Sequence, residues 1–392
     1  MTRPRLVYLC NAIDEITCRE RGINSDSPAA TQKVIQIASA LAEAGVQPII
    51  LSLGRGRQYG SWRWHPAHVR RTGRQVVLYA PFLDAPLLTH VVTMICLLPL
   101  VWRLKRKASD GIAMLAYNWL PHYLLALELG RKLGYRLFLD LEDGHVPSMP
   151  SIRGRLARAA GKRINVLCKD GAILATSSLE TQYPESRTMC CYGVAGLPGP
   201  VRPWSGKLRV LLGGTLQQDT GAGLFIDAVA ELRRREDPAL ADLEFIVTGK
   251  GAMAQAIEAL ETAGVHPQVQ FKGRLSRQAY LEMLDGVHVG LSLKLGSSEL
   301  GDTTFPSKVI EIASAGLLLL TTRVSDVPQL FSEDEAVYLT SETYLELADA
   351  IHWLLGNREQ AAAMAKRGAD RVQDVCAQSH VGRDFRNFLF PN

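Results

Sequence analysis

The feature that most constrains the fold of this chain is the alternation of short apolar segments with longer segments of helical periodicity. Strands that are apolar almost throughout and alternate with helices predict a parallel sheet covered on both faces. In the N-terminal half, the apolar segments are Arg5–Asn11, Pro48–Leu53, Gln75–Ala80, Ile112–Tyr117, Arg136–Leu141 and Ala172–Thr176. The helical segments between them are Pro28–Ala44, Ala85–Lys107, Pro121–Leu133 and Ile152–Lys169.

The same alternation begins again after a segment of different composition. Tyr192–Lys207, YGVAGLPGPVRPWSGK, is rich in Gly and Pro and has no periodic pattern, as is typical of an interdomain linker. The apolar segments beyond it are Leu208–Gly213, Leu243–Thr248, Val269–Lys272, Val287–Leu293, Leu317–Thr322 and Ala336–Leu339. The helical segments are Gly223–Arg235, Ala252–Ala263, Arg277–Leu284, Ser307–Ala315 and Thr343–Leu355, followed by a helical tail from Glu359 to Phe390.

The sequence therefore predicts an α/β protein with two Rossmann-like, doubly wound domains. We expect an N-terminal domain over residues 1–192, a linker over 193–207 and a C-terminal domain over 208–375. A C-terminal helix over 376–392 is amphipathic and is expected to pack back on the N-terminal domain. Ligands bind at the carboxyl ends of the strands in doubly wound sheets, so two such domains would face each other across a central cleft.

The composition and the missing motifs argue against several protein classes. The chain is 47% hydrophobic and 21% charged, with a net charge of +5, as is ordinary for a globular protein. Its seven cysteines include no CxxC pair, and its start has no signal-peptide layout, so we expect a cytoplasmic protein without a zinc site. No P-loop, GxGxxG, HExxH or GxSxG motif occurs. Their absence argues against P-loop NTPases, classical dinucleotide-binding proteins and the obvious hydrolases. A pI near 8.8 without a matching motif gives little support for a nucleic-acid partner.

One apolar segment bears on membrane association. Leu87–Leu104 is interrupted by His90 and Pro99, and it is marginal against the roughly 20 apolar residues of a membrane-spanning helix. We expect a buried core helix. The alternative is an interfacial helix whose basic end contacts lipid headgroups, and a true membrane span is the least favoured reading. The basic residues at this end are Arg103, Lys105, Arg106 and Lys107.

The densest motif is Phe305–Thr322, FPSKVIEIASAGLLLLTT. Pro306 fits the first position of a helix, which would leave the amides of Ser307 and Lys308 free to bind an anion. Glu311 follows one turn later, within reach of a sugar hydroxyl. An ordinary strand–loop–helix–strand unit with a surface Lys and Glu explains the pattern equally well.

This segment resembles the retaining GT-B glycosyltransferases of glycosyltransferase family 4, in the branch with a Pro-x-Lys-x-x-Glu signature. The resemblance implies that amides near Ser307 and Lys308 hold the distal phosphate of a nucleotide-sugar donor. It also implies that Glu311 binds the ribose. The first of the two glutamates common in the family falls on Thr303 here, which leaves the contacts to the donor sugar open. Asp302 and Thr304 are the substitutes for it.

Further segments follow the order of the same family. Gly213-Gly214-Thr215 resembles its glycine turn at the diphosphate, and Thr248-Gly249-Lys250-Gly251 resembles its strand-end Gly-x-Gly near the nucleobase. A lone Gly-Gly is most often only a tight turn. The Arg and Lys that the family places after the glycine turn are missing here, and each substitute taken alone is more often a surface charge. The candidate substitutes are Lys308, Lys294, Arg274 and Lys250.

The candidate acceptor residues lie in the N-terminal half. In DLEDGH, at the end of a predicted buried strand, Glu142, Asp143 and His145 could bind the acceptor hydroxyl or assist its deprotonation, with a helix-capping acidic loop as the alternative. Asn24 occupies the place of the family's first glycine-rich loop. The loop Gly54–Trp64 combines three arginines with two tryptophans, a composition that suits a sugar or lipid-diphosphate acceptor or an interdomain brace. These tryptophans are Trp62 and Trp64.

Together these features predict a retaining transferase, of hexosyltransferase type, that moves a sugar from a UDP- or GDP-sugar to a glycan or lipid-linked acceptor. Lys308, Asp143 and His145 are the candidate catalytic residues, and no tightly bound cofactor or metal is expected. The resemblance favours bacterial surface- or exopolysaccharide assembly, with peripheral contact to the anionic inner face of the plasma membrane. The alternatives are a non-catalytic GT-B-like subunit that binds lipid or a partner protein, and a GT-B-type sugar-nucleotide epimerase.

Overall fold

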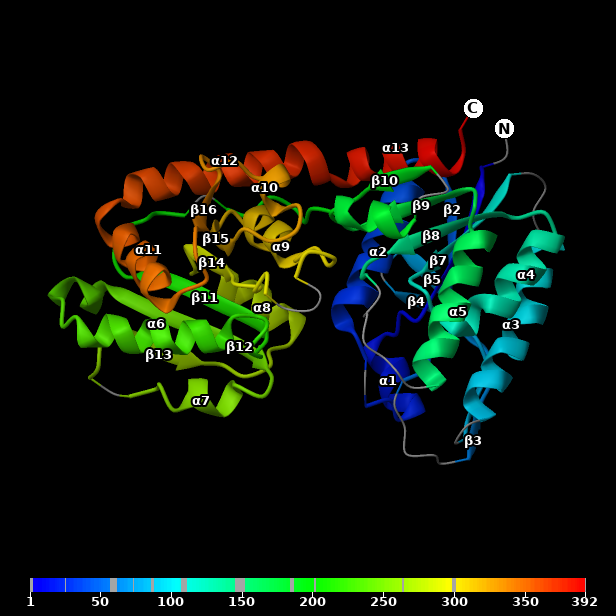
Figure 1. The fold of residues 1–392 in the computed structure, drawn as a ribbon, viewed down its shortest axis with the longest axis horizontal. Coiled ribbons are helices and arrows are strands. Elements are labelled where there is room, and N and C mark those ends of the chain that lie inside the picture. Colours follow the sequence, from blue (N-terminus) through cyan, green and yellow to red (C-terminus); the bar gives the residue numbers. More distant parts are fainter. Residues whose placement is uncertain are drawn as a thin grey trace. The chain divides into compact units, whose positions relative to one another are not determined.

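The chain forms two compact units, each with one main parallel sheet and helices packed against it (Figure 1). One unit comprises Met1–Val194 together with Gln378–Asn392, and the other comprises Ala195–Ala377. The computed structural model describes residues 3–24, 26–56, 62–72, 74–85, 88–106, 111–144, 152–183, 187–200, 202–262, 264–297 and 301–391.

The sheet of the N-terminal unit has eight strands in the order β10-β9-β8-β7-β1-β2-β5-β4. All neighbours are parallel except β4 and β5, and a separate antiparallel pair joins β3 to β6. The strand order reverses at β1, since β2 lies on one side of it and β7 on the other. The strands are β1 (Arg5–Cys10), β2 (Gln47–Ser52), β3 (Arg63–His65), β4 (His68–Thr72), β5 (Gln75–Tyr79), β6 (Phe82–Asp84), β7 (Ile112–Tyr117), β8 (Arg136–Leu141), β9 (Gly171–Leu174) and β10 (Thr188–Cys190).

Amphipathic helices cover this sheet. The side chain of Ser27 accepts from the amide of Ala30, and Pro28 occupies the first turn, so α2 begins where the sequence predicts. The last helix of the chain, α13, packs against α2 and buries Phe385 and Phe388 in the core of this unit. The helices are α1 (Glu15–Arg21), α2 (Pro28–Glu43), α3 (Leu88–Arg106), η1 (Pro121–Tyr123), α4 (Leu124–Lys132), α5 (Ile152–Leu167), η2 (Ser177–Gln182) and α13 (Gln378–Leu389).

The helix α3 differs from the prediction of a buried core helix. Its buried side chains are Thr93, Leu97 and Val101, and only 17% of its most apolar window is buried. The exposed apolar side chains of its other face are Leu88, Val91, Ile95 and Trp102. The prediction was wrong because both faces of this helix are apolar, and sequence periodicity does not tell which face the fold covers. By length and composition α3 is also the one helix, among the described residues, that could cross a membrane.

The sheet of the C-terminal unit has six parallel strands in the order β13-β12-β11-β14-β15-β16. Here the strand order reverses at β11, between β12 and β14. The strands are β11 (Leu208–Thr215), β12 (Leu243–Lys250), β13 (Gln268–Phe271), β14 (Val289–Ser292), β15 (Leu318–Thr322) and β16 (Ala336–Leu339). The helices are α6 (Ala222–Arg234), η3 (Pro238–Asp242), α7 (Ala254–Glu258), α8 (Arg277–Leu284), α9 (Lys308–Ser314), α10 (Val327–Leu330), α11 (Tyr344–Gly356) and α12 (Arg358–Cys376).

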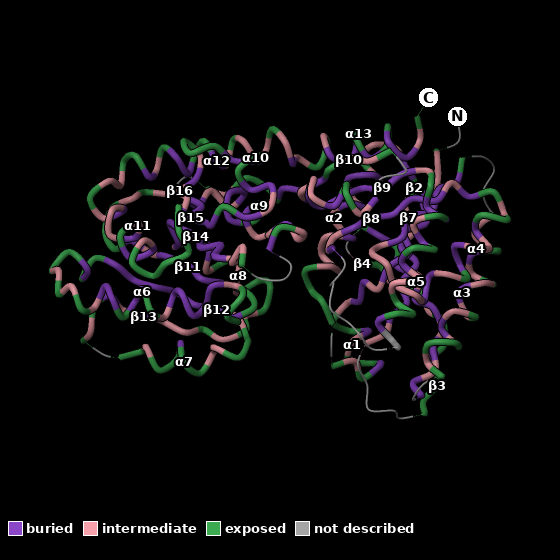
Figure 2. Tube along the Cα trace, in the orientation of Figure 1, coloured by how far each residue is buried: buried purple, intermediate pink, exposed green. Residues whose placement is uncertain are grey.

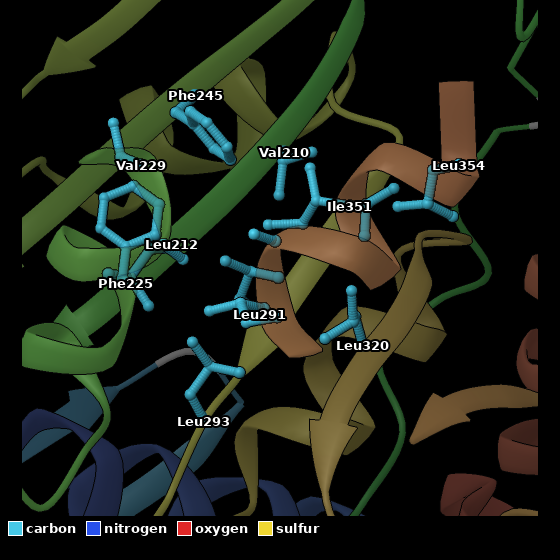
Figure 3. Close-up of a cluster of buried hydrophobic side chains, with 14 of the residues drawn as sticks. Val210, Leu212, Phe225, Val229, Phe245, Leu291, Leu293, Leu320, Ile351 and Leu354 are labelled. Carbon is cyan, nitrogen blue, oxygen red and sulfur yellow. The ribbon is translucent and has the colours of Figure 1, made fainter. Parts of the chain in front are cut away.

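The core of the C-terminal unit lies where α6 and α11 pack on the sheet (Figure 3). Phe225 of α6 and Phe245 of β12 meet edge to face, with ring centroids 5.1 Å apart. In Figure 2 the central strands of each sheet are buried, while outer helix turns and loops are exposed. Such continuous burial explains why near-continuous apolar segments predicted the central strands well.

The short edge elements were not predicted. The strands β3 and β4 have the sequences RWH and HVRRT, which contain no apolar run. The helix predicted over Ala252–Ala263 is confined to Ala254–Glu258, and Ile257 is its buried residue. A polar edge strand and a one-turn helix carry too few buried side chains to give a periodic signal.

Candidate functional site

A glycine turn and a lysine meet at the carboxyl end of β11, where the strand order of the C-terminal unit reverses. Gly214 has φ 106°, in the region that favours glycine, and a Cβ atom on it would overlap Nζ of Lys308. A Cβ on Gly213 would lie 3.9 Å from the same Nζ. The side chain of Lys308, from α9, therefore rests directly on the glycine turn, and a side chain on Gly214 would displace the ammonium.

The ammonium of Lys308 is not neutralised by a direct contact. Within the described part of the chain, Lys308 makes no side-chain hydrogen bond and no ion pair. Burial lowers the pKa of Lys308, and the nearby carboxyl of Glu311 opposes this shift. A half-buried cation without a partner is unfavourable, and an anionic ligand would relieve this cost.

Two further side chains lie near this turn, those of Glu311 and Tyr280. Burial raises the pKa of Glu311, against the effect of Lys308 and Arg277. The residue as a whole is exposed to solvent. Burial, and then Glu311, raise the pKa of Tyr280 on α8, and its hydroxyl would lie 3.8 Å from a Cβ on Gly213. We call Gly213, Gly214, Tyr280, Lys308 and Glu311 the glycine-turn site.

The structure corrects one part of the anion-site prediction. The amide of Ser307 is not free, because it donates to the carbonyl of Phe305 at 2.9 Å. The helix α9 begins at Lys308 rather than Ser307 and has only seven residues. The turn that follows Pro306 occupies this amide before the helix starts. The side chain of Lys308, rather than a row of helix-end amides, is the positive group of this site.

A second glycine packs against the first. In the register of β11 and β12, Gly214 lies opposite Gly249, and a Cβ on Gly249 would overlap the Gly214 carbonyl. The amide of Gly249 and the hydroxyl of Thr248 both donate to the carbonyl of Gly273, at 2.8 and 2.7 Å. The ends of β11 and β12 and the residue Gly273, which follows β13, are thus held close together.

The other predicted donor residues surround this edge. Thr215 and Lys250 lie opposite each other at the ends of β11 and β12, and both are exposed, as is Arg274 after β13. Lys294, after β14, donates from Nζ to the carbonyl of Thr304 at 2.8 Å. The hydroxyl of Thr303 is buried and has no hydrogen-bond partner among the described residues, as is uncommon in native proteins. Lys294 therefore holds the loop that carries Thr303.

In the N-terminal unit the corresponding edge carries a buried charge network. Asp140 of β8 accepts from the hydroxyl of Tyr8 and from Nζ of Lys33, the latter at 3.4 Å, and the same ammonium pairs with Glu142. Burial raises the pKa of Asp140, and Lys33 opposes it. Burial lowers the pKa of Lys33, but the two carboxylates outweigh it and raise that pKa. We call Tyr8, Lys33, Asp140 and Glu142 the Lys33 network.

The predicted acceptor residues are not all gathered in one place. The amide of Glu142 donates to Oδ1 of Asn118 at 2.7 Å, and Asp143 follows it, half-buried. His145 lies outside the described residues. The side chain of Asn24 is exposed. Trp62 and Trp64, at and beside β3, are exposed by 64% and 51%.

Sequence reasoning missed Lys33 and Tyr8 in one unit and Tyr280 and Arg277 in the other. A signal for the first pair exists, because Asp140 interrupts an apolar strand and such a buried carboxylate requires a partner. Nothing in the helical pattern of α8 distinguishes Tyr280. Among the described residues, no group of three or more His, Cys, Asp or Glu side chains is placed to hold a metal ion.

Comparisons with known proteins agree with this architecture. Residues 224–384 match a family model described as glycosyl transferase-like. One component of the phosphatidylinositol N-acetylglucosaminyltransferase of Arabidopsis thaliana is 22% identical over 322 residues, which cover 78% of this chain and 66% of that protein. The chain thus spans slightly less than two thirds of the length of this relative.

Solved structures of similar fold cover nearly the whole chain. A sucrose-phosphate synthase from Thermosynechococcus elongatus superposes with a TM-score of 0.67 at 14% identity, over 98% of this chain and 97% of its own. A UDP-forming trehalose-phosphate synthase from Burkholderia xenovorans gives a TM-score of 0.68 at 12% identity, over 98% and 100%. The predicted GT-B fold is confirmed, and the glycosyl transferase-like match covers most of the C-terminal unit. The chain therefore has the GT-B fold, with a glycosyl transferase-like segment over residues 224–384.

Proposed function

We propose that the C-terminal unit binds a UDP- or GDP-sugar at the glycine-turn site and that the chain transfers the sugar with retention of configuration. One observation supports this proposal above all. The ammonium of Lys308 lies against the Gly213–Gly214 turn and has no ion-pair partner among the described residues. A diphosphate would supply the missing negative charge, and the two glycines allow it to approach the backbone closely. We assign Glu311 to accept hydrogen bonds from the ribose hydroxyls.

The chemical requirement of such a transfer is stabilisation of the departing diphosphate. In the transition state the negative charge on the leaving oxygen grows, so a fixed ammonium beside it lowers the barrier more than it strengthens substrate binding. Lys308 has this role in the proposal. The exposed Lys250 and Arg274 add positive charge at the same edge, while Ser307, Thr303 and Lys294 form the loop at the donor sugar.

We place the acceptor on the N-terminal unit, where Asp143 and His145 assist deprotonation of its hydroxyl, and Asn24, Glu142, Trp62 and Trp64 contribute contacts. A glycan or a lipid-linked acceptor is supported by the name of the Arabidopsis relative, part of a transferase that is named for phosphatidylinositol. We assign the reaction to bacterial surface- or exopolysaccharide assembly at the inner face of the plasma membrane.

The exposed face of α3 supports peripheral membrane contact. Its apolar residues Leu88, Val91, Ile95 and Trp102 share one side of the helix, which ends in Arg103, Lys105 and Arg106. An apolar stripe with a cationic end suits the interface of an anionic leaflet. The helix would lie in the plane of the headgroups rather than cross the bilayer.

A screen of nucleotide sugars tests the central proposal. Purified protein is heated in the presence of UDP-, GDP-, ADP- and TDP-sugars, and a ligand at about 100 times its Kd should stabilise the fold by roughly 2.7 kcal/mol. The stabilising donor is then incubated with candidate acceptors, and the anomeric configuration of the product is read by NMR. Absence of stabilisation by every nucleotide sugar and by UDP and GDP would contradict the proposal.

A further inference from the structure

Three nitrogen-bearing side chains converge in the N-terminal unit, apart from the Lys33 network. His90 of α3 and His122 of η1 stack with ring centroids 4.8 Å apart, and Nδ1 of His90 lies 2.6 Å from Nε2 of His122. The guanidinium of Arg55 reaches both rings, at 3.5 Å from Nδ1 of His90 and in hydrogen-bond contact with Nε2 of His122. We call these three residues the Arg55 cluster.

The cluster lies at the place where this sheet is expected to bind ligands. Arg55 follows β2, His122 follows β7, and these strands flank β1, at which the strand order reverses. Ligands of doubly wound sheets bind outside the carboxyl ends of the strands at such a reversal. Asn11, directly after β1, fixes the backbone of Arg55 by donating to its carbonyl at 2.7 Å and accepting from its amide at 3.1 Å.

The charge of Arg55 is not balanced by a carboxylate of the described residues. The buried Arg21 nearby donates to the carbonyls of Gly54, Ala80 and Pro66, and Arg70 pairs with carboxylates. The side-chain partners of Arg55 within the described residues are instead the two imidazoles.

His122 also retains an unused hydrogen-bonding atom. Its side chain is buried, and its Nδ1 has no hydrogen-bond partner in the described part of the chain. Burial, followed by Arg55 and His90, lowers the pKa of His122 to about 3, so the ring is neutral at pH 7. Arg55 therefore keeps a positive charge beside a neutral ring, where a compact anion would find a fork of N–H donors.

We propose that the Arg55 cluster binds a phosphate group of the acceptor. A guanidinium matches the oxygens of a phosphate in geometry as well as charge, and an imidazole adds a further N–H donor. The inference rests on the proposed function, because it assumes that the acceptor binds the N-terminal unit. It specifies the acceptor as a phosphate or diphosphate ester, either a soluble sugar phosphate or an amphiphile with a phosphate headgroup.

Histidine NMR of the full chain provides the test. The imidazole Cε1–H signals of His90 and His122 are assigned with His90→Gln and His122→Gln, and the protein is titrated with inorganic pyrophosphate in the presence of saturating UDP. Both signals should shift, and Arg55→Gln should weaken the apparent Kd about tenfold, the loss of a charge-assisted hydrogen bond. Lys132→Gln, which removes an exposed cation from α4 of the same unit, should leave the Kd unchanged. Signals that do not shift, or an equal Kd in Arg55→Gln, would overturn the proposal.

A second measurement distinguishes the two sources of phosphate. Glucose 6-phosphate and phosphatidylcholine vesicles with added phosphatidic acid are compared in wild type and Arg55→Gln, with phosphatidylserine vesicles as the control for anionic surface charge. The probe whose binding depends on Arg55 identifies the source, and independence of Arg55 for both overturns the assignment. Failure of the proposed donor site would appear separately, as UDP binding that is absent or that is insensitive to Glu311→Gln.

Discussion

In each unit a helix places a half-buried lysine against the carboxyl edge of the sheet, and these two lysines are used in opposite ways. Lys33 in the N-terminal unit pairs with two carboxylates, and its side chain is only 13% exposed. Lys308 in the C-terminal unit rests on a glycine turn without a hydrogen bond or ion pair among the described residues, near the carboxyl of Glu311. The pKa of Lys33 is raised by its carboxylates, whereas that of Lys308 is lowered by burial.

In this comparison the charge of Lys33 has a structural role, whereas the charge of Lys308 is available to bind a ligand. A buried ion pair is most costly when one partner is removed, because the other is left unpaired. A half-buried ammonium without a partner instead weakens the fold slightly, and it strengthens the binding of an anion beside it. The same substitution, Lys to Met, should therefore affect stability in one unit and activity in the other.

The largest expected effect is on stability. Lys33→Met should lower the free energy of unfolding of the N-terminal unit by about 3 kcal/mol, because it leaves the buried Asp140 carboxylate without its cation. Because two units need not unfold together, amide hydrogen exchange of β1 and β8 is the suitable measurement. Lys308→Met is the matched control and should change protection in the C-terminal unit by less than about 1 kcal/mol. Equal losses for both variants would contradict the comparison.

The second effect is on turnover. At saturating donor, Lys308→Met should lower kcat by about 100-fold, since the leaving diphosphate loses its fixed positive charge. The KM for the donor should change much less. Steady-state kinetics are measured beside Lys366→Met, which removes an exposed lysine of the same unit. A rise in KM with an unchanged kcat would mean that Lys308 contributes to donor binding and does not stabilise the transition state.

The third effect is on nucleotide affinity. Glu311→Gln keeps the size of the side chain but removes its charge, and it should weaken UDP binding by roughly 10- to 100-fold, as the loss of hydrogen bonds to a charged group does. Titration calorimetry gives the affinity directly. Glu282→Gln, on the exposed face of α8, should bind UDP like the wild type. Unchanged UDP affinity in Glu311→Gln would mean that another residue binds the ribose.

The smallest effect per residue is on membrane association. Each of Arg103, Lys105 and Arg106 should contribute about 1 kcal/mol to binding of anionic vesicles at low salt, and the contribution should fall as salt rises. Co-sedimentation of the triple Gln variant should therefore show a large loss, while Lys366→Gln in the other unit shows none. Wild-type protein that stays in the supernatant with every lipid composition would contradict membrane contact.

Much of the fold could be predicted from the sequence because buried parallel strands are apolar along their whole length. The ranges Ile112–Tyr117, Arg136–Leu141 and Ala336–Leu339 were predicted without error, and so was the α/β architecture of both halves. The candidate donor segments could also be predicted, since glycine turns and a lysine after a proline are local patterns. Their contact could not be predicted, because Gly214 and Lys308 lie on different elements that only the strand order brings together.

The sequence by itself determined which segments form the sheets, where the glycines permit close backbone approach, and which charged residues are available. Only the tertiary structure decided which charges are paired, so that Lys33 was overlooked and Lys308 proved to be unpaired within the described part of the chain. It also decided that one apolar face of α3 stays uncovered. The physical reason is the same in both cases. Periodicity is a property of one element, whereas partners and covered faces are set by strand order and register between elements distant in the chain.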